Sequence, residues 1–289
     1  MLRLAVATQA ESYERLRGSL DAHGIEVIAL QTSERTIPLG EDPFPDVDVG
    51  YVFPSRLMEG GVAAAALSVP WLNGREAVLR SRNKAGTLQR LADAGIPVPE
   101  TVLISDPVDR AELVAAFERF DPPVVVKPNS TSRGTGVTLA HDLDSFLGIA
   151  DYLDLVHDYR ATGDQSFLLQ EYVPDARDYR VMVLDGEYVG AVERRMPETA
   201  GRHHWKHNVH HGATPTRVDL SDEHKAVAER VATVLGIPLL GVDLLVTEDR
   251  TLVTETNARP TIDAEHYAEG FWEHLATVIR RTARTDGQQ

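Results

Sequence analysis

The chain has no cysteine, which excludes disulfide bonds, thiol nucleophiles and thiolate metal sites. It has no run of 18 consecutive apolar residues, so no segment is predicted to span a membrane. Its N-terminal residues lack the long apolar region and cleavage site of a signal peptide, and we therefore expect a cytoplasmic protein. The patterns GxGxxG after a first strand and GxxxxGK[ST] are also absent, which disfavours a Rossmann dinucleotide site and a P-loop.

Lysine is scarce in a strongly acidic chain. Only four of the 29 basic residues are lysine, 44 residues are acidic, and the formal net charge is −15. This charge disfavours binding to nucleic acid or to anionic membranes, because both are polyanions. An acidic balance with little lysine resembles that of proteins from salt-accumulating halophiles. Because the chain avoids lysine, each one merits inspection, and they are Lys84, Lys127, Lys206 and Lys225.

The length of 289 residues and the hydrophobic content of 43% support either two domains or one large α/β assembly. The first 80 or so residues alternate strand, helix and strand, which predicts a small open α/β domain. Within it we expect strands at 2–8, 25–30 and 46–53, and helices at 11–23 and 60–68.

Helices and then strands are expected in the remainder of the chain. Asn83 is suited to cap a helix that ends before Gly95, and Ser221 and Gly236 are suited to cap another at 222–236. Asp185-Gly186 predicts the turn of a β-hairpin. Further helices are expected at 109–119, 143–156 and 265–283, and further strands at 101–104, 123–127, 167–173, 179–184, 187–194, 239–246 and 251–257.

The stretch 124–137, VVVKPNSTSRGTGV, runs from a buried strand through a lysine into a loop of small residues. Gly134 and Gly136 lack a Cβ, so the backbone N–H groups of such a loop can approach an anion closely, and Lys127 adds a positive charge beside it. One interpretation is a phosphate-binding loop, and the other is a hairpin with a solvated lysine. This stretch alone does not decide between them, because a single glycine-rich loop is a weak motif.

Two strands near the C-terminus, LLGVDLLV and TLVTETN, carry acidic residues in an apolar setting. With their turn placed at Asp249, Asp243 faces Glu255 and Gly241 faces Asn257. Opposed carboxylates are destabilising unless something positive lies between them. Oxygen ligands of this kind suit Mg²⁺ or Mn²⁺, which bind together with substrate phosphates. The alternative is a surface hairpin whose acids face solvent, and the apolar neighbours on both faces favour the metal site.

The segment HHWKHNVHH at 203–211 holds five of the eleven histidines. Their spacings match no usual set of zinc ligands, so a polar loop over an active site is the favoured interpretation. Lys206, Asn208 and His210 alternate and would project together from an extended segment. His210 is therefore a candidate substrate contact.

In their order and spacing these segments resemble the ATP-grasp superfamily, and within it the ribosomal-protein-S6-modification-like (RimK-type) glutamate ligases. The similarity runs from about residue 50 to 267 and rests on RNKAGTLQRLADAGIPVPET, VVVKPNSTSRGTGV, LLQEYVPDARDYRVMVLDGEYVGAVERR, KHNVHHGA, GVDLLV and TETN. It implies an α/β protein with the α+β ATP-grasp fold. The implied domains are an N-terminal α/β (pre-ATP-grasp) domain at 1–82, a small subdomain with a glycine-rich lid at 83–166, and a C-terminal subdomain with the metal site at 167–289.

The resemblance also implies roles for individual residues. ATP would be bound by residues at its phosphates, adenine and sugar: Lys84, Lys127, Ser132, Gly134, Gly136, Lys206, His207 and Asn208, then Glu171 and Tyr172, and Asp178. One or two Mg²⁺ ions (or Mn²⁺) would be held by Asp243, Glu255 and Asn257. The catalytic candidates are Arg180 and Arg194, which would bind an acyl phosphate or a substrate carboxylate, together with Asn257. The alternative for the two arginines is that they form ion pairs in an acidic protein.

The function that the resemblance implies is ATP-dependent carboxylate–amine ligation with release of ADP. An acylphosphate forms first, and an amine then displaces phosphate to give an amide or peptide bond. Glutamate or another amino acid would be joined to a small-molecule or peptide partner. The alternatives are an ATP-binding module without catalysis and an ATP-grasp phosphotransferase, and the sequence leaves open whether the chain forms a homo-oligomer.

The chain departs from the family pattern after the last metal-site residue. The family usually has a Pro-Gly pair there, whereas this chain reads Ala258-Arg259-Pro260-Thr261. That region helps to shape the acceptor site. Arg259 is therefore a candidate for binding a substrate carboxylate, and the family's specificity for glutamate does not transfer automatically.

Overall fold

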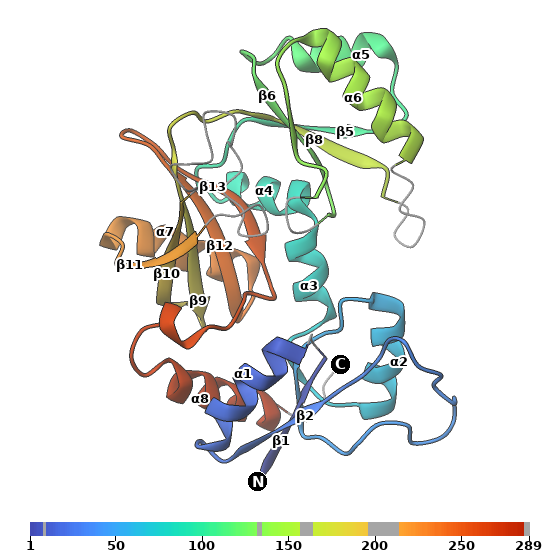
Figure 1. Ribbon diagram of the computed structural model, residues 1–289, viewed down its shortest axis with the longest axis vertical. Coiled ribbons are helices and arrows are strands. Elements are labelled where there is room, and N and C mark those ends of the chain that lie inside the picture. Colours follow the sequence, from blue (N-terminus) through green and yellow to red (C-terminus); the bar gives the residue numbers. More distant parts are fainter. Residues whose placement is uncertain (8–9, 132–134, 157–163, 196–213, 286–289) are drawn as a thin grey trace.

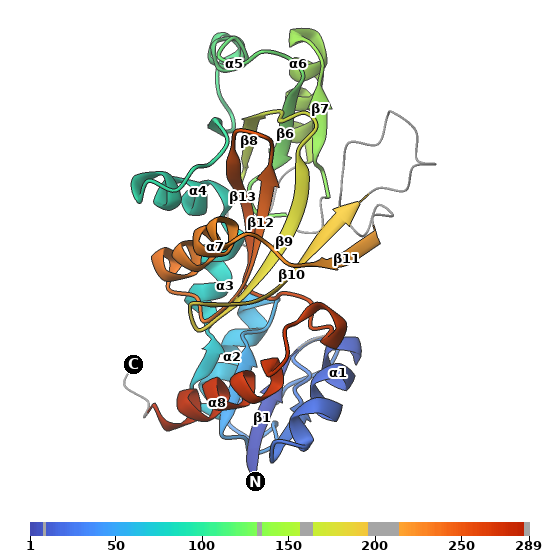
Figure 2. The same cartoon turned by 90° about the vertical axis from the view of Figure 1, so that its left-hand side faces the viewer.

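The computed structural model describes residues 1–7, 10–131, 135–156, 164–195 and 214–285, which form three sheets arranged along the long axis (Figure 1, Figure 2). No helix in these stretches is long and apolar enough to cross a membrane. In chain order the elements are β1 (Leu2–Val6), α1 (Ala10–Asp21), β2 (Ile25–Ala29), β3 (Val49–Val52), α2 (Leu57–Leu67), β4 (Trp71–Asn73), α3 (Arg75–Arg82), α4 (Lys84–Asp93), β5 (Thr101–Ser105), α5 (Arg110–Phe117), β6 (Val124–Pro128), β7 (Thr138–Ala140), α6 (Leu143–Val156), β8 (Ser166–Glu171), β9 (Arg177–Leu184), β10 (Glu187–Arg195), β11 (Thr214–Val218), α7 (Asp222–Leu235), β12 (Leu239–Val246), β13 (Thr251–Asn257), the 3₁₀ helix Ala264–His266 and α8 (Phe271–Arg284).

The first sheet is parallel, with the strand order β2-β1-β3-β4. Leu4 and Val6 of β1 belong to the core that includes α1 and α8, whereas Ala5 packs on the other face with Ala63 of α2. The C-terminal helix α8 therefore completes the core of the N-terminal sheet. The strand order reverses between β1 and β3, so the carboxyl ends of these two strands form the topological switch point of the sheet.

The central sheet is antiparallel, with the strand order β11-β10-β9-β12-β13. Helix α7 packs on β9, β10 and β12, while α3 and α4 pack on β13. The β9–β10 hairpin turns at Asp185 and Gly186, whose φ angles of 55° and 83° are those that a tight two-residue turn requires. This turn was predicted from the Asp-Gly pair and is confirmed.

The third sheet is antiparallel, with the strand order β5-β8-β6-β7, and lies at the top of Figure 1. Helices α5 and α6 cover one face, where Phe117 stacks on Phe146 with ring centroids 5.4 Å apart. The other face carries Lys127 toward the central sheet, and its Nζ lies 3.4 Å from the carbonyl oxygen of Thr254 in β13. The functional candidates lie between these two sheets.

Most predicted elements are confirmed, and the additions are short. The Asn83 side chain caps α4 by accepting from the N–H of Gly86 at 2.9 Å, and Ser221 and Gly236 cap α7. The patterns did not indicate β4, α3, β7 or β11. β4 and β7 have three residues each, too few for alternation to show, and α3 begins without a side-chain cap. The final helix begins at Phe271 rather than at residue 265.

The predicted division into three domains follows the three sheets, with differences at its boundaries. Strand β8 pairs with β5 and β6, so its residues from 167 onward lie in the sheet of the second predicted domain. Helix α4 packs on β13 and α7 of the third, because its apolar face needs the larger core. We keep the division as a proposal, with β8 assigned to the second domain and α8, which packs on β3, β4 and α1, assigned to the first.

Candidate active site

Lys127, the residue that ends the apolar run of β6, lies between the third and central sheets. Its side chain is buried, and its Nζ donates to Gln170 Oε1 at 2.9 Å and to the Thr254 carbonyl at 3.4 Å. Burial lowers the pKa of Lys127 to about 8, an effect that nearby Glu255 partly opposes. A buried lysine held by neutral acceptors keeps its charge available for an anion, which favours the phosphate-binding interpretation over the solvated hairpin.

Gln170, which the sequence patterns did not single out, fixes the position of this lysine. Its Nε2 donates to Thr101 Oγ1 at 2.7 Å, and the Thr101 hydroxyl donates to the Pro99 carbonyl at 2.9 Å. Because the hydroxyl proton of Thr101 is committed to Pro99, its oxygen accepts from the amide, and the amide oxygen must then point at Lys127. A glutamine in a buried strand gave no chemical signal by itself.

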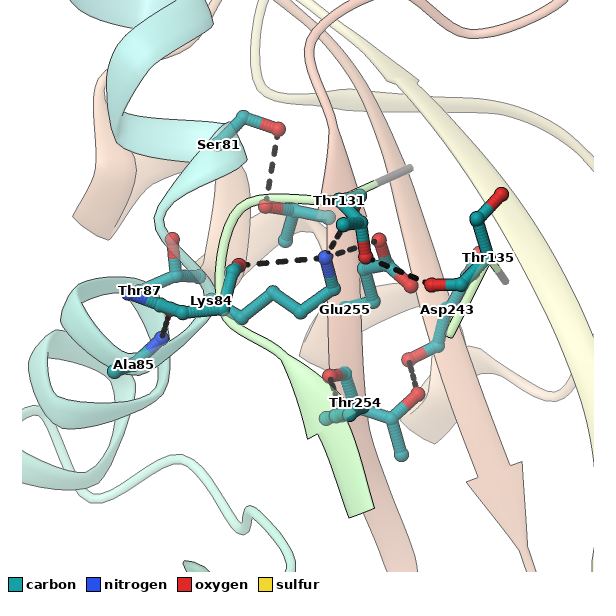
Figure 3. Close-up of polar contacts among 12 residues, drawn as sticks. Ser81, Lys84, Ala85, Thr87, Thr131, Thr135, Asp243, Thr254 and Glu255 are labelled. Atoms are coloured by element: carbon teal, nitrogen blue, oxygen red, sulfur yellow. Dashed lines mark hydrogen bonds and ion pairs between the residues drawn. The ribbon is translucent and has the colours of Figure 1, made fainter. Parts of the chain in front are cut away.

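Lys84, at the start of α4, joins the glycine-rich loop to the last strand (Figure 3). Its Nζ lies 3.4 Å from the Asn129 carbonyl and 3.5 Å from Glu255 Oε1, and it also donates to the Thr131 carbonyl. The Asn129 side chain accepts from the N–H of Ala85 at 2.9 Å. A buried cation is unfavourable at a helix N-terminus, so its surroundings of carbonyls and a carboxylate are needed to hold it there.

Within the described part of the glycine-rich loop, the backbone conformation and close packing at position 136 require a glycine. Gly136 has a φ of 77°, and a Cβ there would lie 2.9 Å from Cγ of Pro128. Thr131 Oγ1 donates to the Thr135 carbonyl at 2.9 Å. Six further candidates lie outside the described residues: Ser132, Gly134, Lys206, His207, Asn208 and His210.

The predicted register of the last two strands is confirmed where the acids lie. Asp243 pairs with Glu255 and Gly241 pairs with Asn257. A shift of one residue follows Asp243, so that Leu244 pairs with Val253 nearer the turn. The bulge was not predicted, but it lies on the turn side of the acids and leaves their pairing intact.

Asp243 belongs to a buried group of two acids and two arginines, Asp178, Arg180, Arg194 and Asp243, which we call the paired cluster. Arg180 donates to both carboxylate oxygens of Asp243 at 2.8 Å. Arg194 donates to Asp178 at 3.0 Å and lies 3.1 Å from Asp243. Burial raises the pKa of the Asp243 carboxyl group, but the two arginines outweigh it and bring the pKa to about 2.

The three predicted metal ligands present oxygen donors of the hard type. Among the described residues, no group of three or more His, Cys, Asp or Glu side chains is arranged to hold a metal ion. Asp243, Glu255 and Asn257 offer two carboxylates and one amide oxygen, which suit Mg²⁺ when nucleotide phosphates and water complete its shell. Lys84 beside Glu255 and Arg180 beside Asp243 supply the positive charge that opposed carboxylates need. The residues therefore fit Mg²⁺.

Glu171, predicted at the adenine hinge, joins the third sheet to the turn between β12 and β13. Its carboxylate accepts from the N–H of Glu100 at 2.9 Å and pairs with Arg250 at 3.1 Å. Tyr172 follows directly after β8. The Arg250 contact thus links the two sheets beside the candidate site.

Arg259 lies at the junction with the first sheet rather than beside the acids. Its guanidinium donates to the Ala7 carbonyl at 2.9 Å and to the Phe53 carbonyl. The Asn73 side chain donates to the Ala258 carbonyl at 2.7 Å and anchors this segment. Burial lowers the pKa of Arg259 to about 10, with Tyr51 raising it and Arg82 lowering it.

Three sheets with two buried lysines and two acids between them define an ATP-grasp protein. The profile of the RimK-like ATP-grasp domain matches residues 81–270. The chain therefore belongs to the RimK-like ATP-grasp family, which confirms the predicted resemblance and fold class.

Named relatives and solved structures agree with this assignment. A probable α-L-glutamate ligase of Klebsiella pneumoniae (strain 342) is 32% identical over 208 residues. The match covers 69% of this chain but only 63% of that protein, which is less than two thirds of its length. The D-alanine–D-alanine ligase of Bacillus anthracis complexed with ATP gives a TM-score of 0.71 at 16% identity, covering 98% of this chain and 96% of that one. The ATP-grasp ligase PsnB, complexed with minimal precursor, Mg and ADP, gives 0.64 at 16% identity, covering 98% and 97%. The two structures share the fold.

Proposed function

We propose that the chain is an ATP-dependent carboxylate–amine ligase that releases ADP. The observation that carries this proposal is the convergence of Lys84 and Lys127 with Asp243 and Glu255 between two sheets, in a member of the RimK-like ATP-grasp family. Both reactants of such a ligation, ATP and a carboxylate, are anions. Buried cations opposite oxygen ligands for a metal ion supply the charge neutralisation and positioning that the reaction needs.

The nucleotide would lie between the third and central sheets. Lys84 and Lys127 are assigned to its phosphates because both are buried. Lys84 contacts the glycine-rich loop at the Thr131 carbonyl, and Lys127 contacts the last strand at the Thr254 carbonyl, next to Glu255. Glu171 and Tyr172 are assigned to the adenine. Asp178 is kept as the candidate for the sugar, and its bond to Arg194 gives it a second role in orienting that arginine. The remaining ATP contacts are assigned to Gly136 and, outside the described residues, Ser132, Gly134, Lys206, His207 and Asn208.

Asp243, Glu255 and Asn257 would hold Mg²⁺, or Mn²⁺ in its place. When bound, the metal ion neutralises phosphate charge and helps to orient the nucleotide. In this role Asp243 would keep its arginine partners, since a carboxylate oxygen has more than one lone pair. The Mg and ADP bound to PsnB support the choice of magnesium.

The ligation proceeds in two steps. A carboxylate oxygen of the acid attacks the γ-phosphorus of ATP, the bond from phosphorus to the bridging oxygen breaks, and ADP leaves with that electron pair. The amine nitrogen then attacks the acyl carbon, phosphate leaves with the carbon–oxygen pair, and the amine loses a proton. Arg180 and Arg194 carry the positive charge that would neutralise the acylphosphate.

Amino acids are the favoured substrates, joined to a small molecule or a peptide. The relative named as a glutamate ligase and the D-alanine–D-alanine ligase support an amino acid, and the precursor bound to PsnB supports a peptide. His210, outside the described residues, is kept as a further candidate substrate contact. The net charge of −15 argues against nucleic acid and anionic membranes as partners. A cytoplasmic location and a homo-oligomer are likewise proposals.

The test follows oxygen atoms during turnover. Candidate acids labelled with ¹⁸O in the carboxylate are incubated with ATP, Mg²⁺ and candidate amines. Ligation through an acylphosphate transfers one labelled oxygen to inorganic phosphate in each turnover. Label in AMP would indicate adenylation instead, and a phosphorylated product without an amine would indicate a phosphotransferase. ATP binding without acid-dependent turnover would indicate a binding module.

Adaptation to high salt is a separate proposal that rests on composition. The chain has 44 acidic and 29 basic residues, so carboxylates repel one another unless salt screens them. We expect the melting temperature to rise between low and molar KCl. A melting temperature that stays flat across this range contradicts the halophile inference and leaves the ligase proposal standing.

A further inference from the structure

The guanidinium of Arg259 is largely withdrawn from solvent without an acid beside it. Within the described part of the chain, its contacts are with the carbonyl oxygens of Ala7 and Phe53, and no carboxylate forms an ion pair with it. The second cation nearby, Arg82, likewise bonds a carbonyl, that of Ser55 at 3.1 Å. Buried cations normally have anionic partners, because losing hydration without a counter-charge is costly. In so acidic a chain, a largely buried arginine without an acid indicates that the missing anion comes from a ligand, and the half-exposed Arg82 adds a second positive charge nearby.

The position of Arg259 in the fold points the same way. The two carbonyl groups that it contacts follow β1 and β3, the strands on either side of the switch point of the first sheet. The crevice outside the carboxyl ends of the strands at such a point is where open α/β sheets bind ligands. Arg259 enters this crevice from the central sheet, only two residues beyond Asn257, whose Oδ1 accepts its N–H at 2.8 Å. A ligand held here would lie next to the proposed metal site.

Tyr51 supplies a third, independent observation. It lies on β3 beside the switch point, is only 2% exposed, and interacts electrostatically with Arg259. Among the residues that the structure describes, its hydroxyl group has no hydrogen-bond partner. Buried polar groups almost always have partners, and an unsatisfied one calls for an explanation. A hydroxyl near Arg259 can donate to the same anion that this arginine would bind.

We propose that Tyr51, Arg82 and Arg259 form a subsite for a substrate carboxylate that the ligation does not consume. Arginine presents a planar fork of N–H groups that matches a carboxylate in two parallel hydrogen bonds, and the tyrosine hydroxyl adds a third donor. This subsite deepens the proposed function and rests on it. It also narrows the substrates, because one of them must carry a carboxylate in addition to its reacting group.

The retained carboxylate defines a chemical class of substrate. In amide formation the reacting acid loses its carboxylate, and a simple amine has none to offer. The subsite therefore requires either an amine that is a free amino acid or an acid with a second carboxylate group. A simple alkylamine paired with a monocarboxylic acid would leave Arg259 without an anion, so such a pair would be ligated poorly.

Binding of matched probe pairs tests the subsite on the whole chain. Calorimetry with Mg²⁺ and a non-hydrolysable ATP analogue compares four acids with the amides that lack one carboxylate: L-glutamate with isoglutamine, L-aspartate with isoasparagine, L-alanine with L-alaninamide, and succinate with succinamate. We expect at least one acid to bind about tenfold or more tightly than its amide, because a charge-assisted bond to arginine is lost. Arg259→Gln should abolish this preference.

Tyr51→Phe separates binding from folding. Because the hydroxyl has no partner in the described part of the chain, its removal should leave the melting temperature unchanged or higher, yet weaken binding of the preferred acid about three- to tenfold. Arg280→Gln is the matched control, since Arg280 also donates to a carbonyl, that of His23, across the first domain. This variant should keep the preference for the acid over the amide.

Three results would overturn the subsite. These are the absence of any acid-over-amide preference in the wild type, a preference that survives both Arg259→Gln and Tyr51→Phe, and a preference lost equally in Arg280→Gln. The proposed function fails in a different way. A carboxylate preference without any acid- and amine-dependent ADP release removes the ligase proposal, whereas ADP release without that preference removes only the subsite.

Discussion

The molecule holds two groups of buried or half-buried arginines, and they differ in their partners. In the paired cluster, Arg180 and Arg194 are bonded to Asp178 and Asp243 within the protein. At the switch point of the first sheet lie Arg259 and its neighbours Arg82 and Tyr51, which we call the unpaired cluster. Within the described stretches of the chain, the two arginines bond carbonyl oxygens and the Tyr51 hydroxyl has no hydrogen-bond partner. The same residue type thus occurs once with its counter-charge built in and once without it.

The difference teaches how each cluster relates to the reaction. Acids that balance the paired cluster hold it in one arrangement before any substrate arrives, which suits groups that must meet a transferring phosphoryl group in fixed geometry. The unpaired cluster bears the cost of desolvated charge that an incoming carboxylate would relieve. A ligand that supplies the missing negative charge binds more tightly because it removes this cost. The paired cluster would therefore contribute to the rate of the reaction, and the unpaired cluster to the choice of substrate.

The largest expected effect comes from breaking the paired cluster. Asp243→Asn keeps the shape of the side chain but leaves Arg180 and Arg194 facing a neutral amide in a buried site. Removal of one partner from a buried ion pair typically costs about 3–5 kcal/mol. We expect a loss of this size in the free energy of unfolding, measured with denaturant in the absence of nucleotide and metal.

Glu255→Gln is the matched control for this experiment. Glu255 is the other acidic candidate for the metal, but 34% of its side chain is exposed and its one described ion pair, with Lys84, is 3.5 Å long. Its substitution should cost less stability than that of Asp243, because the partner Lys84 keeps the carbonyl groups of Asn129 and Thr131. Both variants should lose Mg²⁺-dependent ADP formation. Equal stability losses in the two variants would contradict the distinction between a structural and a purely ligand-binding acid.

A smaller effect is expected from Gln170, which orients Lys127 without touching substrate. Gln170→Leu removes the acceptor at 2.9 Å from Lys127 Nζ, so the lysine would be held only by the more distant Thr254 carbonyl. We expect the dissociation constant of Mg²⁺–ATP, measured by calorimetry, to rise about tenfold, which corresponds to the loss of about one charged hydrogen bond. Thr101→Val should raise it less, because the amide remains but is free to turn. An unchanged constant in Gln170→Leu would rule out the positioning role.

Local chemistry in the sequence predicted the parts of the site that depend on neighbouring residues. The Asp-Gly turn, the caps at Asn83 and Ser221, and the pairing of Asp243 with Glu255 follow from short-range rules, and the structure has all of them. The bulge after Asp243 could not be predicted, since both registers keep apolar residues on the buried side. It matters little to the site because it lies toward the turn.

The missed features depend on contacts between distant segments. The paired cluster unites β9, β10 and β12, so the bonds from Arg180 and Arg194 to Asp243 have no signal in sequence spacing. Arg259 was expected near the acceptor substrate, but its bonds to the ends of β1 and β3 follow from the docking of the last strand against the first sheet. Tyr51 looked like an ordinary core residue of a strand, and only its unpartnered hydroxyl group distinguishes it.

An ion pair between β9 and β10 of the central sheet gives a still smaller, pH-dependent effect. Hydrogen bonds from Arg177, opposed by burial and aided by Arg195, lower the pKa of Glu193 to about 2 from an ordinary value of 4.5. Because the folded pKa is the lower one, the stabilisation is complete above about pH 4.5 and disappears as the pH falls toward 2.

The expected size of this stabilisation is only about 1 kcal/mol, because both arginines are more than half exposed. The difference in unfolding free energy between wild type and Glu193→Gln should be constant from pH 6 to 8 and vanish near pH 2; a constant difference throughout would contradict the assignment.

The smallest effect on stability is expected for Arg259 of the unpaired cluster, and it can be compared directly with Arg194 of the paired cluster. Arg259→Met removes an arginine of the unpaired cluster, and Arg194→Met removes one of the paired cluster, with the same change in shape. In the paired cluster, Asp178 and Asp243 lose a shared partner, so a loss of several kcal/mol follows. In the unpaired cluster, the lost bonds to the carbonyl groups of Ala7 and Phe53 are offset by removal of a desolvated charge, and the change should stay within about 1 kcal/mol. Denaturant unfolding of both variants in the same buffer decides the matter. If Arg259→Met is as destabilising as Arg194→Met, Arg259 is a structural clamp between the first and central sheets, and its missing acid has no bearing on substrates.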